Sequence, residues 1–135
     1  MSKIFGQELL LDAYNCRGNI NNKDFIQLFI DDLVLKSNMQ KKGDTIFEYF
    51  EDNEYNRERD IVGYSVIQII SLSNVTLHIN EISKSIYLNF FTCGNFFCDL
   101  VVDIFKKYFN PEHFRVSIVE RDAKMCITMQ MEQDS

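Results

Sequence analysis

The 135-residue sequence contains no tryptophan, one proline and only five glycines. This composition excludes a proline-rich tail or a glycine-rich flexible linker, because such segments need these residues in quantity. No run approaches the roughly 18 consecutive apolar residues of a membrane-spanning helix, so none is predicted. We also expect no signal peptide, because residues 1–6 are too few and too polar to form one.

Positive charge is scarce as well. The chain has 14 Lys and Arg residues and 20 Asp and Glu residues, which gives a net charge of −6. Nucleic acids and anionic membranes bind to positive surfaces, so we expect neither as a partner. The four cysteines, Cys16, Cys93, Cys98 and Cys126, form no CxxC pair and show no ligand spacing with histidine, so no metal site is predicted. We expect free thiols, which indicates the reducing cytoplasm.

Apolar residues, by contrast, are plentiful. They make up 46% of the chain and include twelve Phe, which is enough for one domain spanning residues 1–135. Continuous and alternating apolar segments predict strands, whereas an apolar stripe of helical period predicts two helices. The predicted strands are residues 4–16, 45–50, 61–73, 75–79, 85–91 and 114–120, the last extended by 124–129. The predicted helices are residues 22–39, capped by Asn22, and 96–109, ended by Pro111.

This order of elements favours an α+β domain of two layers, with two helices on one face of a mostly antiparallel sheet. Residues 51–60, EDNEYNRERD, are highly charged and predict an exposed loop, the least ordered part of the chain. Val66 and Ile70 fall on one side of their strand, and Ile67 and Ile69 on the other. Two helices cover only one apolar face, so we expect the other to meet a second sheet in a dimer.

Four residues stand out by their spacing: Ser65, Ser73, His78 and Cys93. Taken singly, each has an ordinary structural explanation, such as a serine within a strand or a cysteine before a helix. Ser73 lies eight positions after Ser65, His78 lies five positions after Ser73, and Cys93 lies twenty positions after Ser73. Together with the sequences around them, these spacings resemble the prokaryotic S-adenosylmethionine decarboxylase family.

Three segments carry most of the resemblance. GQELLLDAYNC, residues 6–16, resembles the family's opening strand G-x-H-L-x-x-D-x-Y-x-C, with Glu8 in place of the usual histidine. SLSNVTLH, residues 71–78, occupies the place of the family's A-E-S-H-L-S-I-H, and FTCG, residues 91–94, matches F-T-C-G outright. The resemblance extends over residues 6–121.

The resemblance implies self-cleavage. Members of the family make a pyruvoyl group from a serine whose hydroxyl attacks the preceding carbonyl, so that the amide becomes an ester and elimination breaks the chain. Here the cleavage would fall between Leu72 and Ser73 and give a β chain of residues 1–72 and an α chain of residues 73–135. The pyruvoyl group is the expected cofactor, with neither a metal nor pyridoxal phosphate. It would form a Schiff base with the substrate amine and accept the electrons of the leaving carboxylate.

The same resemblance implies a role for each residue. Ser73 is the nucleophile and the pyruvoyl precursor, and His78 is the base that removes its α-hydrogen, a task that suits an imidazole near neutral pH. Ser65 stabilises the processing intermediate. Cys93 returns a proton to the substrate carbon after carbon dioxide leaves. Glu81 lies one residue from the place of the family's nucleoside-binding acid, so we expect it to contact the substrate.

The implied function is decarboxylation of S-adenosylmethionine, which supplies the aminopropyl donor for polyamine (spermidine) biosynthesis. In the family two sheets face each other across a homodimer, and the active site lies near that interface. Two alternatives stay open, because residues 79–82, INEI, replace the family's T-W-P-E and residues 51–60 replace its H-x-F-x-P. One is a sister pyruvoyl decarboxylase of ornithine or arginine. The other is an unprocessed, non-catalytic homologue that acts by binding.

Overall fold

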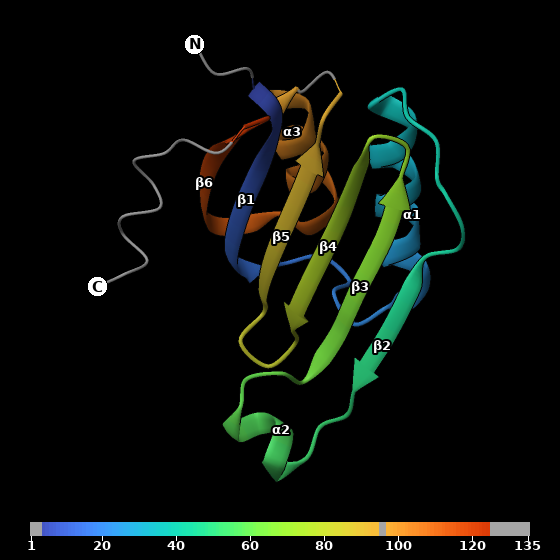
Figure 1. Cartoon of the computed structure of the whole chain (residues 1–135). Coiled ribbons are helices and arrows are strands. Elements are labelled where there is room, and N and C mark those ends of the chain that lie inside the picture. Colours follow the sequence, from blue (N-terminus) through green and yellow to red (C-terminus); the bar gives the residue numbers. More distant parts are fainter. Residues whose placement is uncertain (1–3, 95–96, 125–135) are drawn as a thin grey trace.

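The computed structural model describes residues 4–94 and 97–124. In these residues six strands form one sheet of order β2-β3-β4-β5-β1-β6, and every neighbouring pair is antiparallel (Figure 1). The strands are β1 (Ile4–Cys16), β2 (Ile46–Phe50), β3 (Gly63–Ile70), β4 (Ser73–Asn80), β5 (Ser85–Thr92) and β6 (Pro111–Asp122). The helices are α1 (Lys23–Lys36), α2 (Glu54–Glu58) and α3 (Cys98–Phe109). The predicted α+β class, with a mostly antiparallel sheet, is confirmed.

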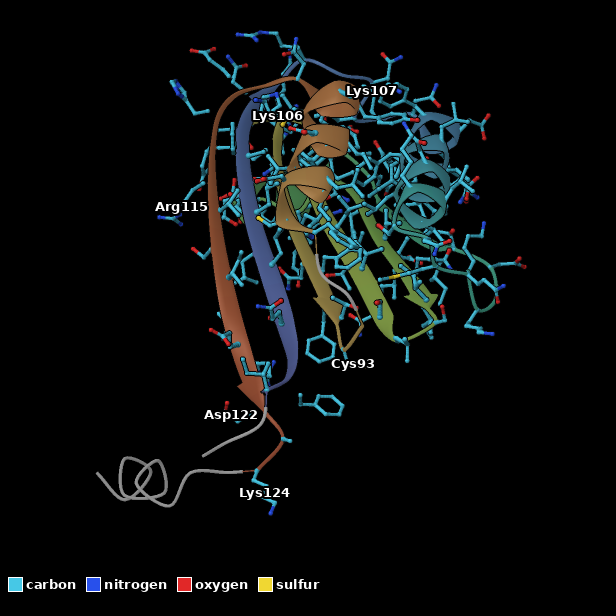
Figure 2. All side chains as sticks on the ribbon, turned by 90° about the horizontal axis from the view of Figure 1, so that it is seen from above. Cys93, Lys106, Lys107, Arg115, Asp122 and Lys124 are labelled. Carbon is cyan, nitrogen blue, oxygen red and sulfur yellow. The ribbon has the colours of Figure 1, made fainter. Side chains whose placement is uncertain are left out.

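The core lies between one face of the sheet and the helices α1 and α3, around which the sheet curls (Figure 2). Alternate side chains of the strands point into it, such as Leu9 and Leu11 of β1, which are fully buried. Phe29 of α1 meets Phe105 and Phe109 of α3, with ring centroids 5.9 and 4.9 Å apart. We call this side of the sheet the helix face and the other side the open face.

Local polar contacts set the ends of the two long helices. The Asn22 side chain accepts a hydrogen bond from the backbone of Phe25 at 2.9 Å, which confirms the predicted cap of α1. This helix ends at Lys36 rather than near residue 39, because Asn38 takes a left-handed φ of 58°. Asn110, with a φ of 40°, ends α3 in the same way. None of the described helices is long and apolar enough to cross a membrane.

The prediction of a loop over residues 51–60 was wrong, because this segment contains α2. The Asn53 side chain caps the helix by accepting a hydrogen bond from the Asn56 backbone at 2.8 Å, and Arg57 forms an ion pair with Asp52. No residue of α2 is buried. The helix is therefore held by local polar contacts, which an analysis of apolar periodicity does not detect.

The structure also divides what was predicted as one strand over residues 61–73. Ile70 pairs with Ser73, so β3 ends at Ile70 and a two-residue turn, Ser71-Leu72, leads into β4. Leucine is not a turn-forming residue, which explains why the boundary was missed. Of the predicted extension at residues 124–129, Lys124 is not in a strand, and the rest lies outside the described residues, as does Cys126.

Replacing Phe29 by alanine should lower the free energy of unfolding by about 3–5 kcal/mol, because its ring is fully buried between α1 and α3. Leu28, the preceding residue, is 59% exposed. Leu28→Ala should change the same quantity by no more than about 0.5 kcal/mol. Chemical denaturation of both variants measures the difference, and equal losses would contradict this packing.

Candidate active site

The expected cleavage point lies in the turn between β3 and β4. Leu72 is 65% exposed and takes a φ of 64°, a left-handed conformation that costs a residue with a β-carbon roughly 1–2 kcal/mol. Its carbonyl oxygen accepts two hydrogen bonds from Cys93, one from the backbone N–H at 2.9 Å and one from the thiol at 3.4 Å. Two donors aimed at one carbonyl oxygen can stabilise the negative charge that nucleophilic attack places there.

Ser73 is the first residue of β4, and its side chain points toward the helix face, where it is 8% exposed. Its hydroxyl donates a hydrogen bond to the thioether sulfur of Met39 at 3.2 Å. The turn is held further by Gln40, whose carbonyl accepts from the Ser71 N–H at 2.9 Å and whose N–H donates to the Ser71 hydroxyl at 3.2 Å. Sequence reasoning missed Met39, because no motif joins residues 34 positions apart.

The open face carries a second polar cluster. Ser65 of β3 and His78 of β4 lie directly opposite each other, with the Ser65 Oγ 3.1 Å from the His78 Nδ1. The Tyr87 ring lies beside the imidazole, with centroids 6.4 Å apart. These three side chains, together with Thr76 and Asn89, line an open cavity of about 260 Å³. The structure thus brings the two predicted processing helpers together.

The same structure separates that pair from Ser73. Ser73 and His78 are five residues apart in β4, whose pairing with β3 and β5 is uninterrupted between them. An odd spacing places two side chains on opposite faces of a sheet, and five residues of antiparallel strand span about 17 Å. Within one chain, therefore, the imidazole does not reach the α-hydrogen of Ser73, whereas Cys93 does lie at the turn.

Glu81 is engaged elsewhere. It follows β4, at the opposite end from Ser73, and its Oε1 accepts a hydrogen bond from the Tyr49 hydroxyl at 2.8 Å. This hydrogen bond to a carboxylate, with burial adding to it, raises the pKa of Tyr49 to about 12. The other carboxylate oxygen, Oε2, is buried and has no hydrogen-bond partner among the described residues. The predicted substrate contact of Glu81 would have to compete with Tyr49.

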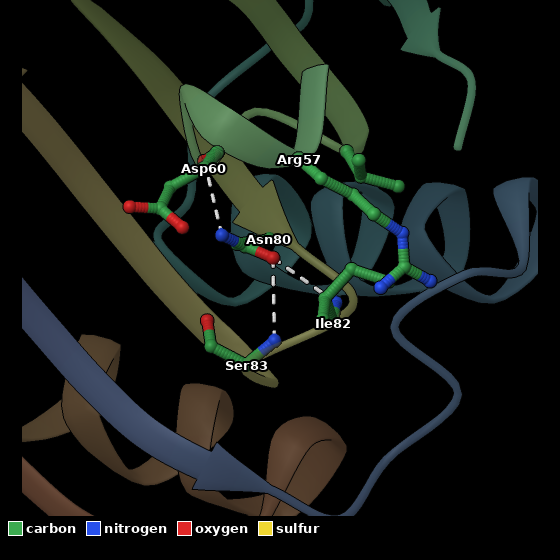
Figure 3. A pocket seen from close by; sticks show the side chains of 6 residues that line it. Arg57, Asp60, Asn80, Ile82 and Ser83 are labelled. Atoms are coloured by element: carbon green, nitrogen blue, oxygen red, sulfur yellow. Dashed lines mark hydrogen bonds between the residues drawn. The ribbon is translucent and has the colours of Figure 1, made fainter. Parts of the chain in front are cut away.

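Asn80, in the segment that differs from the family pattern, shapes a turn. Its amide nitrogen donates to the Asp60 carbonyl at 3.0 Å, and its amide oxygen accepts from the backbone of Ile82 at 3.0 Å and of Ser83 at 3.2 Å (Figure 3). A cavity of about 150 Å³ lies between this turn and Arg57 of α2. Both ends of the Asn80 amide are used within the turn, so the cavity is a product of turn packing.

The thiols differ in environment. Cys16 is buried, and burial raises its pKa to about 11. Burial also raises the pKa of Cys98, with the nearby Asp99 adding to the effect. Cys93 is exposed and adjoins the turn. Among the described cysteines, Cys93 is therefore the one placed to donate a proton near residue 73.

The overall fold matches that of a known enzyme. The crystal structure of the adenosylmethionine decarboxylase from Aquifex aeolicus VF5 superimposes with a TM-score of 0.75, at 17% sequence identity, over 92% of this chain and 96% of that one. The class of protein is thus a two-layer α+β domain of the kind found in that decarboxylase. A family model described as S-adenosylmethionine decarboxylase matches residues 7–122. The chain therefore belongs to the S-adenosylmethionine decarboxylase family.

Curated relatives agree with this assignment. The S-adenosylmethionine decarboxylase proenzymes of two Clostridium kluyveri strains, ATCC 8527 and NBRC 12016, are each 32% identical to this chain over 91 residues. The matched region covers 67% of this chain and 64% of each relative, so the chain matches a little under two thirds of their length.

Replacing Glu81 by glutamine should lower the pKa of Tyr49 from about 12 toward the usual value of about 10. The neutral amide stabilises the protonated phenol less than the carboxylate does, so the tyrosine ionises at lower pH. Ultraviolet titration of tyrosinate, with Tyr49→Phe identifying the band, measures the shift. Glu48→Gln, on the neighbouring residue, should leave this titration unchanged, and a shift of equal size in that variant would contradict the contact.

Proposed function

We propose that this chain is a pyruvoyl-dependent S-adenosylmethionine decarboxylase that cleaves itself between Leu72 and Ser73. The observation that carries the proposal is the Leu72 carbonyl, which precedes Ser73 in a left-handed turn and accepts two hydrogen bonds from Cys93. Membership of the family supports it. The free thiols of Cys16, Cys93 and Cys98 are compatible with the cytoplasm as its compartment.

The processing steps follow from the turn. The Ser73 hydroxyl oxygen bonds to the Leu72 carbonyl carbon, and the charge on the Leu72 oxygen is held by the N–H and the thiol of Cys93. The proton of the Ser73 hydroxyl passes to the nitrogen of residue 73, and breaking the C–N bond then gives an ester and a free amine on that residue. A base removes the α-hydrogen, and the Leu72 carboxylate leaves with the ester oxygen. Water replaces the nitrogen, which departs as ammonia and leaves a ketone at residue 73.

The residues around the turn fit a pyruvoyl group. The pairing of Ser73 with Thr92 would keep the new chain end at the start of β4, beside Cys93. Such a group supplies a carbonyl that withdraws electrons from the carbon losing carbon dioxide. The exposed thiol of Cys93 holds a proton at Sγ that can pass to that carbon.

A homodimer would supply the missing base. The Ser65–His78 pair lies on the open face, and Ser73 lies about 17 Å further along β4 on the other face. Ile67 and Ile69 on the open face are 43% and 55% exposed, which suits contact with a second apolar sheet. In our proposal the Ser65–His78 pair of one protomer serves the Ser73 turn of the other.

A second candidate function is decarboxylation of ornithine or arginine. The observation that favours it is the use of residues 80 and 81 within the protein itself. Asn80 holds a turn together, and Glu81 binds Tyr49. In this stretch the Asn80 amide and one oxygen of the Glu81 carboxylate are therefore already engaged. Pyruvoyl chemistry itself needs only an α-amino acid as substrate.

The purified protein should separate into fragments of residues 1–72 and 73–135 on denaturing electrophoresis, the second fragment carrying a pyruvoyl mass. Ser73→Ala should leave one full-length band and no activity above background, because the nucleophilic oxygen is gone. Intact mass spectrometry after prolonged incubation checks both results. A wild-type chain that stays whole would overturn the proposal.

The released gas identifies the substrate. Carbon dioxide from carboxyl-labelled S-adenosylmethionine, and not from labelled ornithine or arginine, supports the main proposal. The reverse pattern supports the sister decarboxylase. Ser71→Ala, which changes a serine of the same turn without removing the nucleophile, is the matched control and should still yield both fragments.

Complementation tests whether His78 acts between protomers. His78→Ala alone should slow processing by roughly 10²–10⁴-fold, the usual contribution of a general base. When the His78→Ala and Ser73→Ala chains are produced together in equal amounts, roughly half of the His78→Ala chains should be cleaved. Random pairing into two-fold dimers gives half of them a partner with an intact imidazole. Different tags on the two chains allow each to be followed by mass. A His78→Ala chain that pairs with its partner yet stays whole would contradict action between protomers.

A further inference from the structure

We propose that the carboxylate of Glu8 binds the cationic centre of the substrate's side chain, in a pocket on the open face beside the processing turn. This inference deepens the proposed function and rests on it. The pocket has a volume of about 400 Å³. Its lining residues are Phe5, Glu8, Asn74, Phe91, Arg121 and Asp122.

The strand register places this pocket next to residue 73. Asn74 follows Ser73 in β4, and it pairs with Phe91 of β5, which in turn pairs with Glu8 of β1. Glu8 therefore lies two strands from Asn74, about 10 Å away at the usual strand spacing. Phe91 is two residues before Cys93, the proposed proton donor. The side chain of an α-amino acid bound at residue 73 can thus reach the neighbouring residues Asn74, Phe91 and Glu8.

The pocket has the chemistry of a cation site. The Phe5 and Phe91 rings stack with centroids 6.4 Å apart, and the Arg121 guanidinium already lies 6.0 Å from the Phe91 ring. Aromatic ring faces attract cations. Arg121 leaves the two carboxylates of the pocket, Glu8 and Asp122, with a net negative charge, so an anionic ligand would be repelled.

Among the described residues, the Glu8 carboxylate has no hydrogen-bond or ion-pair partner, in contrast to Asp12, four residues later on the same face of the strand. Asp12 forms an ion pair with Arg115 at 2.9 Å, and Figure 2 shows Arg115 pointing away from the helices. Within residues 4–94 and 97–124, neither Glu8 nor Asp122 takes part in a hydrogen bond or ion pair through its side chain, and Figure 2 shows Asp122 at the end of β6. A cationic group entering the pocket would therefore meet two aromatic rings and a carboxylate that none of the described residues pairs.

Glu8 is also a point of departure from the family pattern, in which a histidine usually stands at this position. A carboxylate is negative at neutral pH, whereas an imidazole there is neutral or positive. Two sources of the cation share this chemistry. One is the sulfonium of S-adenosylmethionine, and the other is the ammonium or guanidinium of ornithine or arginine.

Calorimetric binding to the full-length Ser73→Ala chain tests this inference independently of cleavage. S-adenosylmethionine, ornithine and arginine are the cationic probes, and S-adenosylhomocysteine, which lacks the sulfonium, is the neutral one. At least one cationic probe should bind, and adding Glu8→Gln should weaken its binding about tenfold. The affinity for the neutral probe should stay within about twofold, which a general loss of structure would not permit. The cationic probe that responds identifies the source of the charge.

Glu120→Gln is the matched control, because Glu120 precedes Arg121 in β6 and pairs with Gln7 on the other face of the sheet. It should leave every affinity unchanged, and Glu8→Asp, which keeps the charge, should retain the preference for the cation. The inference is overturned if no cationic probe binds, or if Glu8→Gln and Glu120→Gln bind alike. If the wild-type chain stays uncleaved but binding still depends on Glu8, the processing proposal fails and the proposal for Glu8 stands.

Discussion

The carbonyl of Leu72 is the constraint around which the proposed chemistry is arranged. It belongs to the two-residue turn between β3 and β4, and both of its hydrogen bonds come from Cys93, the residue that follows β5. The ladder between β4 and β5 brings the backbone donor into place, and the thiol follows from the same residue. One cysteine can therefore act on the chain before cleavage and on the substrate afterwards, without any rearrangement of the sheet.

The unbroken alternation of β4 places its core side chains on one face of the sheet and His78 on the other. Side chains on its helix face, including Val75 and Ile79, are fully buried in the core, whereas His78 projects from the open face. A bulge between Ser73 and His78 would bring both to one side, but it would also move every later apolar side chain out of the core. Retaining the core therefore keeps Ser73 apart from the Ser65–His78 pair within one chain. In the proposed dimer, a second protomer would bring the two together.

Much of this architecture could be predicted from the sequence, because burial imposes a period on the chain. The apolar patterns of β1, α1 and α3 are strong, and their limits came within a few residues of those observed. Elements held by polar contacts were not predicted. The helix α2 depends on the Asn53 cap and the Asp52–Arg57 pair, and the left-handed Leu72 contradicts the preferences of its residue type.

The candidate site shows the same limit. Motif spacing singled out Ser65, Ser73, His78 and Cys93 as candidates, but how the four are grouped in space depends on strand register. Ser65 lies opposite His78 in the β3–β4 pairing, whereas the offset of five positions from Ser73 to His78 places these two on opposite faces. Met39 and the pocket around Glu8 join elements far apart in the chain. No local pattern contains that information.

Cleavage at the proposed position would divide the sheet between two chains. Residues 1–72 contribute β1, β2 and β3, and residues 73–135 contribute β4, β5 and β6, yet β1 lies between β5 and β6 in the sheet. The two products would therefore be interleaved, and separating them would break the β3–β4, β5–β1 and β1–β6 pairings at once. A single nick at the turn would thus leave a two-chain molecule that stays together without a disulfide and unfolds as one cooperative unit.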